Sequence, residues 1–537
     1  ISMKKNIIIK FLAGISVLSL AASCNYEEIN TNPYEMTDEM GKMDGLSLGS
    51  YITTMERYVL PVGTQADRTD MINEYQIAYN LSADCWSGYF GQDNNWGGGN
   101  NNTTYYLNNG WLSATYKDSY TNVLPSWKKI KATSEKLNAP EVFALAEILK
   151  ISCWHKTLES FGPIPYTHAG EMALVIPFDS EKDVYTAMFK DLKAAIEVLT
   201  PYAETNSTIV ADYDAVYAGS ARQWVKYANS LMLRLAMRIR YADEAMSKQW
   251  VGEALSQHIG LMTAVNDAAQ MSKGAGYVFV NNIQYLAESY EECRVATSVY
   301  AYLNGYHDPR LGKYMKPSPT YPSALTGFDG EKYAPIPSGT AYPKGTYAKA
   351  ALPNMTSDTP TYWMRTSEVL FLKAEAALVW PEFGDAADLY KKGVEMSFEE
   401  NGLSAAAADA YLTTSFKPEA VSIFSYTAPA PTEATTEFSG TTEQKLEKIM
   451  IQKWIALYPN GQEAWTEWRR TGYPVLNQVR DNRGTGYGVT KEDRIRRMMY
   501  PESFYQSEQD KANYQDALSK LGGNDSPTTR LWWDCKK

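Results

Sequence analysis

Aromatic and amide side chains alternate in one stretch that has no helical or strand periodicity, Gly88–Trp111 (GYFGQDNNWGGGNNNTTYYLNNGW). Sugars present apolar C–H faces between hydroxyl groups. A pyranose ring therefore stacks on Trp or Tyr while Asn, Asp, Gln and Arg side chains satisfy its hydroxyls. Because the stretch supplies both kinds of group, we expect a loop that binds a carbohydrate. The candidate ligand-binding residues in it are Trp96, Tyr89, Asp93, Asn95, Asn100, Tyr105 and Trp111.

Two questions about these candidates stay open at the level of sequence. Trp96 lies in an Asn/Gly stretch with no periodicity that would bury it, but it could still cover the core while the Asn residues only solvate a loop. A further candidate, Tyr306, lies in the stretch Tyr300–Tyr314. In the same stretch, Asp308-Pro309-Arg310 is typical of a turn.

Catalysis is the rival class of function, and the sequence gives it little support. A glycosidase needs two carboxylates at a set separation, but with 62 acidic residues the spacing along the chain cannot select a pair. No GxSxG, HExxH or P-loop motif is present, and GTGYG (484–488) lacks a preceding strand and a following helix. The four histidines, at 155, 168, 258 and 307, form no ligand cluster. We therefore expect no enzyme, no cofactor and no metal site.

Helical periodicity surrounds the candidate loop and predicts a mostly α-helical protein. Apolar residues recur at helical spacing within 41–90 and over 113–137, 141–159, 183–199, 220–241, 250–258, 365–380, 384–398 and 443–458. The pattern fails from about 270 to 360, which predicts irregular structure with short strands at best. A Thr-, Ala- and Pro-rich segment, 415–442, is typical of an exposed loop.

Small residues suggest how two of these helices meet. Ala374 and Ala377 in the first helix, and Ala386 and Ala387 in the second, face large apolar residues across a short Phe383-Gly384-Asp385 turn. This arrangement predicts a tetratricopeptide-like (TPR-like) helix pair. The other predicted helix pairs do not follow a strict 34-residue repeat, so we describe them as TPR-like and not as TPR units.

Three polar or aromatic motifs are interpreted as structural. In QEAWTEWRRTGYP (462–474) the tryptophans are expected to pack a helix onto the core, with Arg469 and Arg470 in ion pairs. LWWD (531–534) is interpreted as a C-terminal plug, and FGPIPYT (161–167) as the exit from a helix. The cluster Arg494, Arg496 and Arg497 could bind an acidic sugar, but ion pairing is favoured in a net-acidic protein.

The N-terminal segment has the pattern of an export signal. Lys4 and Lys5 precede an apolar run, Ile7–Leu20, that is too short for a comfortable transmembrane helix. Leu20-Ala21-Ala22-Ser23 before Cys24 has the form of a lipoprotein box. We expect cleavage after residue 23, acyl chains including palmitate on Cys24, and a tether over 24–40. A buried helix with a structural cysteine is the alternative.

Charge and cysteine content exclude other classes of function. The formal net charge is −11, which argues against nucleic-acid binding. The cysteines other than Cys24 lie far apart, at 85, 153, 293 and 535, without metal spacing. Buried free thiols are expected there, because a chain of 537 residues can build a large core without disulfides.

Several motifs together, in order along the chain, resemble the SusD/RagB family of outer-membrane lipoproteins. They are EINTNPYE after Cys24, FGPIPYT, RTSEVLFLKAEAAL, QKWIALYPNGQEAWTEWRRTGYP, RIRRMMYPESFY and TTRLWWD. The resemblance covers nearly all of the chain after Cys24. It implies TPR-like helix pairs (an α–α superhelix) packed against an irregular, loop-rich half with few short strands. We place the body at 41–537, with TPR-like helices mainly in 41–265 and 361–400 and the loop-rich part mainly in 266–360 and 401–537.

The resemblance also implies a function. Family members are surface-exposed lipoproteins that capture oligosaccharides, or in some members peptides, and pass them to a SusC-like TonB-dependent transporter without catalysis. We therefore expect a cell-surface protein, lipid-anchored to the outer membrane, with an oligosaccharide ligand. A neutral glycan is the default. Peptide capture, and a surface glycoside hydrolase as a weaker option, remain alternatives.

Overall fold

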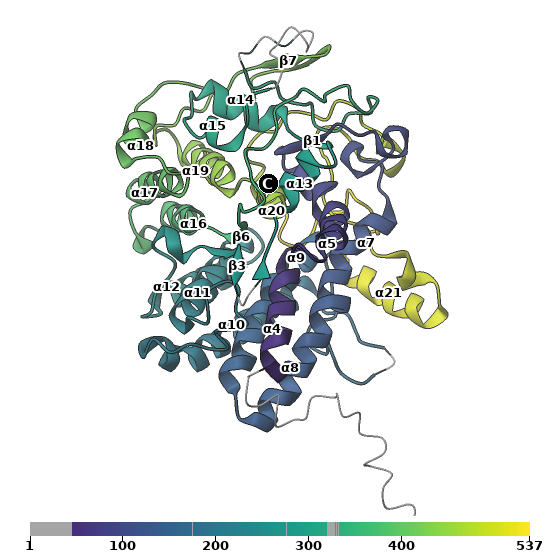
Figure 1. Cartoon of the computed structure of the whole chain (residues 1–537), viewed down its shortest axis with the longest axis vertical. Coiled ribbons are helices and arrows are strands. Elements are labelled where there is room, and N and C mark those ends of the chain that lie inside the picture. Colours follow the sequence, from purple (N-terminus) through teal and green to yellow (C-terminus); the bar gives the residue numbers. More distant parts are fainter. Residues whose placement is uncertain (1–45, 174, 275–276, 319–327, 329, 331) are drawn as a thin grey trace, which may run out of the picture. The chain divides into compact units, whose positions relative to one another are not determined.

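A computed structural model describes residues 46–173, 175–274, 277–318, 328, 330 and 332–537 (Figure 1). The predicted signal segment at 1–23, the predicted lipid site Cys24 and the predicted tether at 24–40 lie outside these residues. The description below concerns Leu48–Lys537, which form one unit. Among the described residues, no helix combines the length and apolar character that a bilayer span requires.

Consecutive antiparallel helices form the first part of this unit, and each packs on the next. N-cap side chains define where they begin: Ser180, Ser220 and Asp243 each accept a hydrogen bond from the first turn of their helix. The helices are α8 (Leu124–Leu137), α9 (Pro140–Phe161), α10 (Glu181–Glu204), α11 (Ala221–Arg238) and α12 (Glu244–Ser256).

A second group of helices continues the array through a contact between α11 and α16. In Figure 1 these helices lie on the side of the molecule away from α21. They are α16 (Thr366–Val379), α17 (Ala386–Glu400), α18 (Ala405–Leu412) and α19 (Thr442–Leu457). The predicted mostly α-helical class with TPR-like pairs is confirmed.

The α16–α17 pair forms as predicted, but its close contact has a different origin. Ala374 and Ala377 are buried, whereas Ala386 is half-buried and Ala387 is exposed. A Cβ at Gly393 in α17 would lie 2.7 Å from the Phe371 ring of α16. The absence of a side chain at Gly393, rather than alanines on both helices, therefore allows the two helices to approach.

The segment predicted as one helix over 113–137 is divided. Helix α7 (Asn109–Lys117) leads into a wider π-helical turn, η5 (Asp118–Val123), before α8 begins. The N-terminal helices before it are α4 (Leu46–Val59), α5 (Arg68–Tyr75), the π-turn η2 (Gln76–Asn80) and α6 (Ala83–Trp86).

Strands are short and pair in twos, all antiparallel. The pairs are β1 (Phe90–Gln92) with β5 (Cys293–Val295), β2 (Ala269–Met271) with β6 (Thr361–Met364), β3 (Lys273–Gly274) with β4 (Tyr277–Val278), and β7 (Val421–Ile423) with β8 (Tyr426–Ala428). The first pair aligns Phe90 with Val295 and so anchors the start of the candidate stretch Gly88–Trp111, which the sequence predicts to be a loop throughout.

The part predicted to be irregular over 270–360 contains three short helices, which the sequence prediction missed. They are α13 (Asn282–Glu288), α14 (Thr297–Gly305) and α15 (Leu311–Tyr314). Two α-helices follow later in the chain, α20 (Gly461–Thr471) and α21 (Glu508–Leu521). Short 3-10 turns connect other elements: η3 (Trp96–Gly99), η4 (Asn102–Thr104), η6 (Val265–Asp267), η7 (Pro381–Phe383), η8 (Thr485–Tyr487) and η9 (Glu502–Tyr505).

Helix α20 and the C-terminal residues are buried together, which confirms the structural interpretation of both motifs. Trp465 and Trp533 are fully buried, and the guanidinium of Arg469 lies 3.4 Å and 4.8 Å from their ring centroids. Arg470 pairs with Glu375 and Glu467, both at 2.7 Å. Arg469 differs from the prediction, because its nearest hydrogen-bond acceptors are backbone carbonyls rather than a carboxylate.

Candidate ligand-binding site

The candidate loop leaves β1 and is held at its start by Asp93. The Asp93 carboxylate accepts hydrogen bonds from the backbone N–H groups of Gly345 (3.2 Å) and Tyr347 (2.6 Å). The next residue, Asn94, donates to Glu292 at 2.8 Å. Two distant segments therefore fix the base of the loop, although nothing in its local sequence is periodic.

Glycines shape the turn η3 that carries Trp96. Gly97, Gly98 and Gly99 have φ of 62°, 67° and 90°, which residues with a Cβ rarely adopt. A Cβ at Gly99 would also lie 2.4 Å from the Cβ of Ala341. Asn101 then donates to the Trp96 carbonyl at 2.9 Å and locks the turn. The glycine run therefore positions Trp96, and it lets the chain at Gly99 pack closely against Ala341.

Trp96 and Trp111 form an aromatic pair at the surface. Both side chains are half-buried, and their rings meet edge to face with centroids 6.0 Å apart and planes at 88°. Asn108 positions Trp111, because its side chain accepts from the Trp111 N–H at the start of α7. The Nε1 of Trp96 has no acceptor among the described residues. This nitrogen is buried, so the exposed part of the Trp96 ring is the part that a ligand can contact.

Amide and tyrosine side chains lie next to this pair along the chain. Asn95 is half-buried and Asn100 is exposed. Tyr106, 44% exposed, meets Tyr487 with ring centroids 6.2 Å apart. Sequence reasoning missed Tyr487 as a site residue, since it lies in the GTGYG turn. The one available signal was an aromatic residue in a glycine-rich turn, since Tyr487 lies between two glycines and Trp96 precedes three.

Four predicted ligand-contact residues are enclosed by the protein instead. Tyr89 stacks on Trp454 at 5.2 Å and donates to its carbonyl oxygen, and Tyr306 donates to the carbonyl of Ala434. Tyr89, Tyr105 and Tyr306 are at most 1% exposed, and Asp93 is 3% exposed. These side chains offer no surface to a ligand in this structure, because contacts from distant segments cover them.

The carboxyl groups nearest the loop are engaged with the protein. Burial raises the pKa of Asp93, and it also raises the pKa of Glu292. A raised carboxyl pKa can mark a general acid. Here, however, Glu292 accepts from both Gln76 and Asn94, and Asp93 holds two backbone N–H groups. Both carboxyls therefore act as anchors of the loop.

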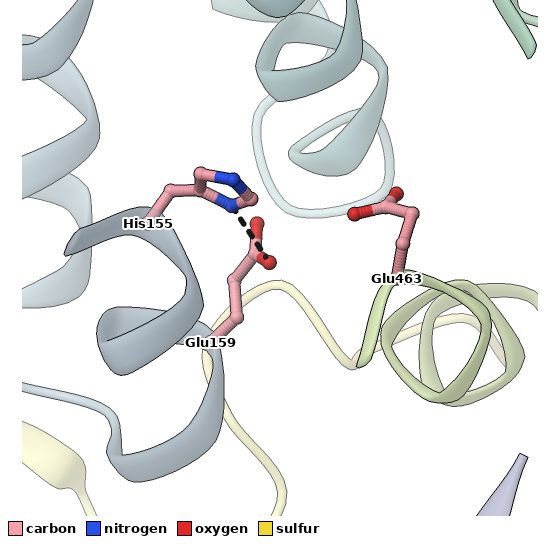
Figure 2. Close-up of side chains that lie close together, drawn as sticks. All are labelled: His155, Glu159 and Glu463. Atoms are coloured by element: carbon pink, nitrogen blue, oxygen red, sulfur yellow. Dashed lines mark hydrogen bonds and ion pairs between the residues drawn. The ribbon is translucent and has the colours of Figure 1, made fainter. Parts of the chain in front are cut away.

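A separate buried cluster has the residue types of a metal site. His155 and Glu159 of α9 lie opposite Glu463 of α20, with the His155 ring 3.2 Å from Glu159 (Figure 2). Arg238 contacts the carboxylate of Glu159 at 3.0 Å and also contacts the carboxylate of Glu463. Arg234 lies 3.8 Å from Glu463. These guanidinium groups take the oxygens that a cation would need, so we interpret the cluster as an ion-pair network.

The basic cluster near the C-terminus is also structural. Arg497 pairs with Asp525 at 2.5 Å, Arg496 lies 3.5 Å from Asp534, and Arg494 donates to the carbonyls of Leu476 and Asn477. Ion pairing, the favoured interpretation, holds for Arg496 and Arg497. The cysteines Cys85, Cys153 and Cys293 are buried and free as expected, but Cys535 is exposed because it lies near the chain end.

Comparison with known proteins identifies the family. A sequence model of the SusD-like family, described as Susd and RagB outer membrane lipoprotein, matches residues 28–534. The chain belongs to this SusD-like family. Its members are outer-membrane lipoproteins, which agrees with the resemblance found in the motifs. No curated protein matches this chain.

Solved structures of SusD homologues share the fold. A chitin-binding SusD homologue from Flavobacterium johnsoniae is 30% identical, with a TM-score of 0.82 over 91% of this chain and 99% of that one. SusD homologues from Bacteroides thetaiotaomicron and Bacteroides uniformis are each 31% identical over 91% of this chain and 99% of theirs, with TM-scores of 0.80 and 0.81. The SusD-like fold therefore extends over nearly the whole chain.

Proposed function

We propose that this SusD-like protein captures oligosaccharides at the cell surface and delivers them to a SusC-like TonB-dependent transporter without altering them. The observation that carries the proposal is the half-exposed pair Trp96 and Trp111 on a rigid loop. Asn95 and Asn100 lie beside it.

The geometry of this pair suits a sugar. Two indoles at 88° present one ring face and one ring edge, so a pyranose that stacks on one ring can contact the other at its side. The exposed amide of Asn100 and the half-buried amide of Asn95 can donate to and accept from hydroxyl groups. Because the glycine turn and Asp93 hold the loop in place, little ordering entropy opposes binding.

A relative supports the class of ligand. The homologue from Flavobacterium johnsoniae is described as chitin-binding. We extend glycan binding to this chain from that similarity and from the aromatic pair, and a neutral glycan remains our proposal.

The absence of catalysis is part of the proposal. Asp93 and Glu292, the acidic groups that hold the loop, are 3% and 5% exposed and bind protein donors. A glycosidase needs one carboxyl to reach the glycosidic oxygen and another to reach the anomeric carbon or a water. We therefore expect bound glycans to be recovered unchanged.

A binding and turnover experiment tests these points together. The purified protein is titrated with neutral oligosaccharides, acidic oligosaccharides and mixed peptides, and the recovered ligands are analysed by mass spectrometry. Saturable binding of a neutral oligosaccharide without products supports the proposal. Binding of peptides alone would favour the alternative of peptide capture, and cleaved glycan would establish an enzyme. Co-purification with a TonB-dependent transporter from native membranes tests delivery.

Anchoring at Cys24 is a proposal of its own. We propose removal of residues 1–23, lipidation of Cys24 and a tether over 24–40 before the body at 41–537. Mass spectrometry of the protein extracted from native membranes should find an acylated N-terminal Cys24. A Cys24→Ser variant should lose membrane association, whereas Cys535→Ser, the matched control at the exposed cysteine, should keep it.

A further inference from the structure

A groove lined by tyrosines opens beside the first turn of α7. Its volume is about 720 Å³, within the range of small-molecule sites. Helix α21, which lies at the edge of the molecule in Figure 1, forms one wall. The residues that carry the argument are Asn109, Tyr487, Glu502, Tyr505, Tyr514 and Gln515.

Hydrogen bonds hold the walls of this groove together. Asn109 of α7 donates to the carbonyl of Tyr500 and accepts from the backbone N–H of Glu502, both at 3.0 Å. On the other wall, Tyr514 of α21 donates to Asp525 at 3.0 Å. The groove is therefore formed by fixed contacts between segments almost 400 residues apart.

The exposed groups in the groove match a neutral sugar. Tyr505 is 37% exposed, and its ring lies 5.3 Å from that of Tyr514, which is half-buried. Gln515 and Glu502 are exposed and provide donors and acceptors. Lys511, also exposed, is paired with Glu508 at 2.6 Å, so no strong positive charge selects an anion.

The groove shares α7 with Trp111, and Tyr487 links it to Tyr106. Tyr487 lines the groove and also contacts Tyr106, which follows the Trp96 turn. Asn109 lines the groove and lies two residues before Trp111 in the same helical turn. Because residues two apart on a helix point to different sides, a chain molecule bound on the tryptophan pair would cross the first turn of α7 to enter the groove.

We propose that this groove is a second sugar subsite, which binds further residues of the same neutral oligosaccharide and makes the protein selective for longer chains. The proposal rests on the proposed function and specifies its ligand. Short oligosaccharides fill the tryptophan pair alone, whereas longer ones also stack on Tyr505.

Affinity as a function of chain length tests the second subsite. The probes are chito-, malto-, cello- and xylo-oligosaccharides of two to six residues, measured by calorimetry with wild type, Trp96→Ala, Tyr505→Ala and Tyr505→Phe. For the series that binds, affinity should rise with length. Tyr505→Ala should weaken the hexamer about tenfold and leave the dimer unchanged. Tyr505→Phe keeps the ring and should stay close to wild type.

The outcomes separate the two proposals. If Trp96→Ala weakens binding but Tyr505→Ala leaves the hexamer unchanged, the second subsite is wrong and the tryptophan site stands. If Tyr505→Ala weakens every length equally, the groove is not a distal subsite. If only Tyr505→Ala weakens binding, the tryptophan site is wrong. Failure of all four series to bind would overturn both proposals. Thermal melts confirm that each variant is folded.

Discussion

Trp96 and Trp111 meet edge to face, with ring centroids 6.0 Å apart, although they belong to two different elements. Trp96 lies in the glycine turn η3, and Trp111 lies in the first turn of helix α7. Each ring is half-buried, so neither completes the core. The pair therefore combines a fixed angle with exposed aromatic surface, which is the property on which the proposed glycan site depends.

Removal of either ring should weaken glycan binding. Trp96→Ala and Trp111→Ala should each cost about 1–3 kcal/mol, or about five- to hundredfold in Kd, by analogy with aromatic–base stacking. Since the two rings touch, the double variant should lose less than the sum of the single losses. Calorimetry with the best-binding oligosaccharide measures all three. Tyr277→Ala, which removes a 45% exposed ring in β4, is the control. An equal loss in the control would argue against a local site.

The buried ion-pair network should be essential for stability. Arg238 contacts Glu159, Glu463 and Glu467, and Arg238→Met would leave these buried carboxylates short of a partner. The expected loss is about 3–5 kcal/mol in the free energy of unfolding. Denaturant titration measures it. Lys248→Met, which removes an exposed pair with Glu382, should cost no more than about 1 kcal/mol.

The same network predicts a loss of stability in acid. Burial alone would raise the pKa of Glu159, but Arg238 and His155 outweigh it and lower the pKa to about 2. The pKa values of Glu463 and Glu467 are also below the usual 4.5, because arginines outweigh burial there as well. The folded protein thus binds fewer protons than the unfolded chain below about pH 4.5, and the stabilisation is lost toward pH 2. The difference in denaturant midpoint between wild type and Arg238→Met should therefore shrink from pH 5 to pH 3, and a difference that does not change with pH would contradict this account.

Glu56 of α4 should have the opposite dependence on pH. Burial first, and then the neighbouring Asp214, raise its pKa well above 4.5, so between pH 4.5 and the folded pKa the folded protein holds a proton that the unfolded chain releases. Stability therefore falls as the pH rises above about 4.5 toward the folded pKa, by up to about 1.4 kcal/mol per pH unit. In Glu56→Gln the amide can still accept from the Ala215 N–H, as Glu56 does at 2.9 Å, without holding a proton.

The difference in melting temperature between Glu56→Gln and wild type should therefore grow in favour of the variant from pH 6 to pH 9. Other titrating groups cancel in this difference. Glu56→Ala, which removes the hydrogen bonds and leaves a cavity, should be less stable than Glu56→Gln at every pH. A difference that does not change with pH would show that Glu56 is ionised in the folded protein.

Thiol reactivity should distinguish one cysteine from the others. Burial raises the pKa of all four thiols in the described part of the chain, but reagents reach only the exposed Cys535, since Cys85, Cys153 and Cys293 are buried. Native protein extracted from membranes should react with Ellman's reagent at one thiol, and at four in guanidinium, since the sulfur of a lipidated Cys24 is blocked. Five thiols in guanidinium would contradict the proposed anchor. Cys535→Ser should abolish the reaction of the native protein.

Local patterns predicted much of the helical framework. Apolar spacing indicated α9, α10, α11, α16, α17 and α19 within a few residues of their ends. The short helices α13, α14 and α15 were missed, because frequent prolines downstream and weak periodicity hid them. Periodicity also could not show that Gly393, rather than Ala386 and Ala387, permits the closest helix contact.

The sequence by itself determined the helical class, the family and the stretch in which the candidate site lies, because helix periodicity, motif order and local composition are properties of neighbouring residues. Only the tertiary structure decided which rings face solvent. Trp96 and Trp111 remain half-exposed, whereas Tyr89 is covered by Trp454, and Tyr487 reaches Tyr106 from nearly 400 residues away. Burial depends on which distant segments pack over a side chain, and that information is absent from the local pattern.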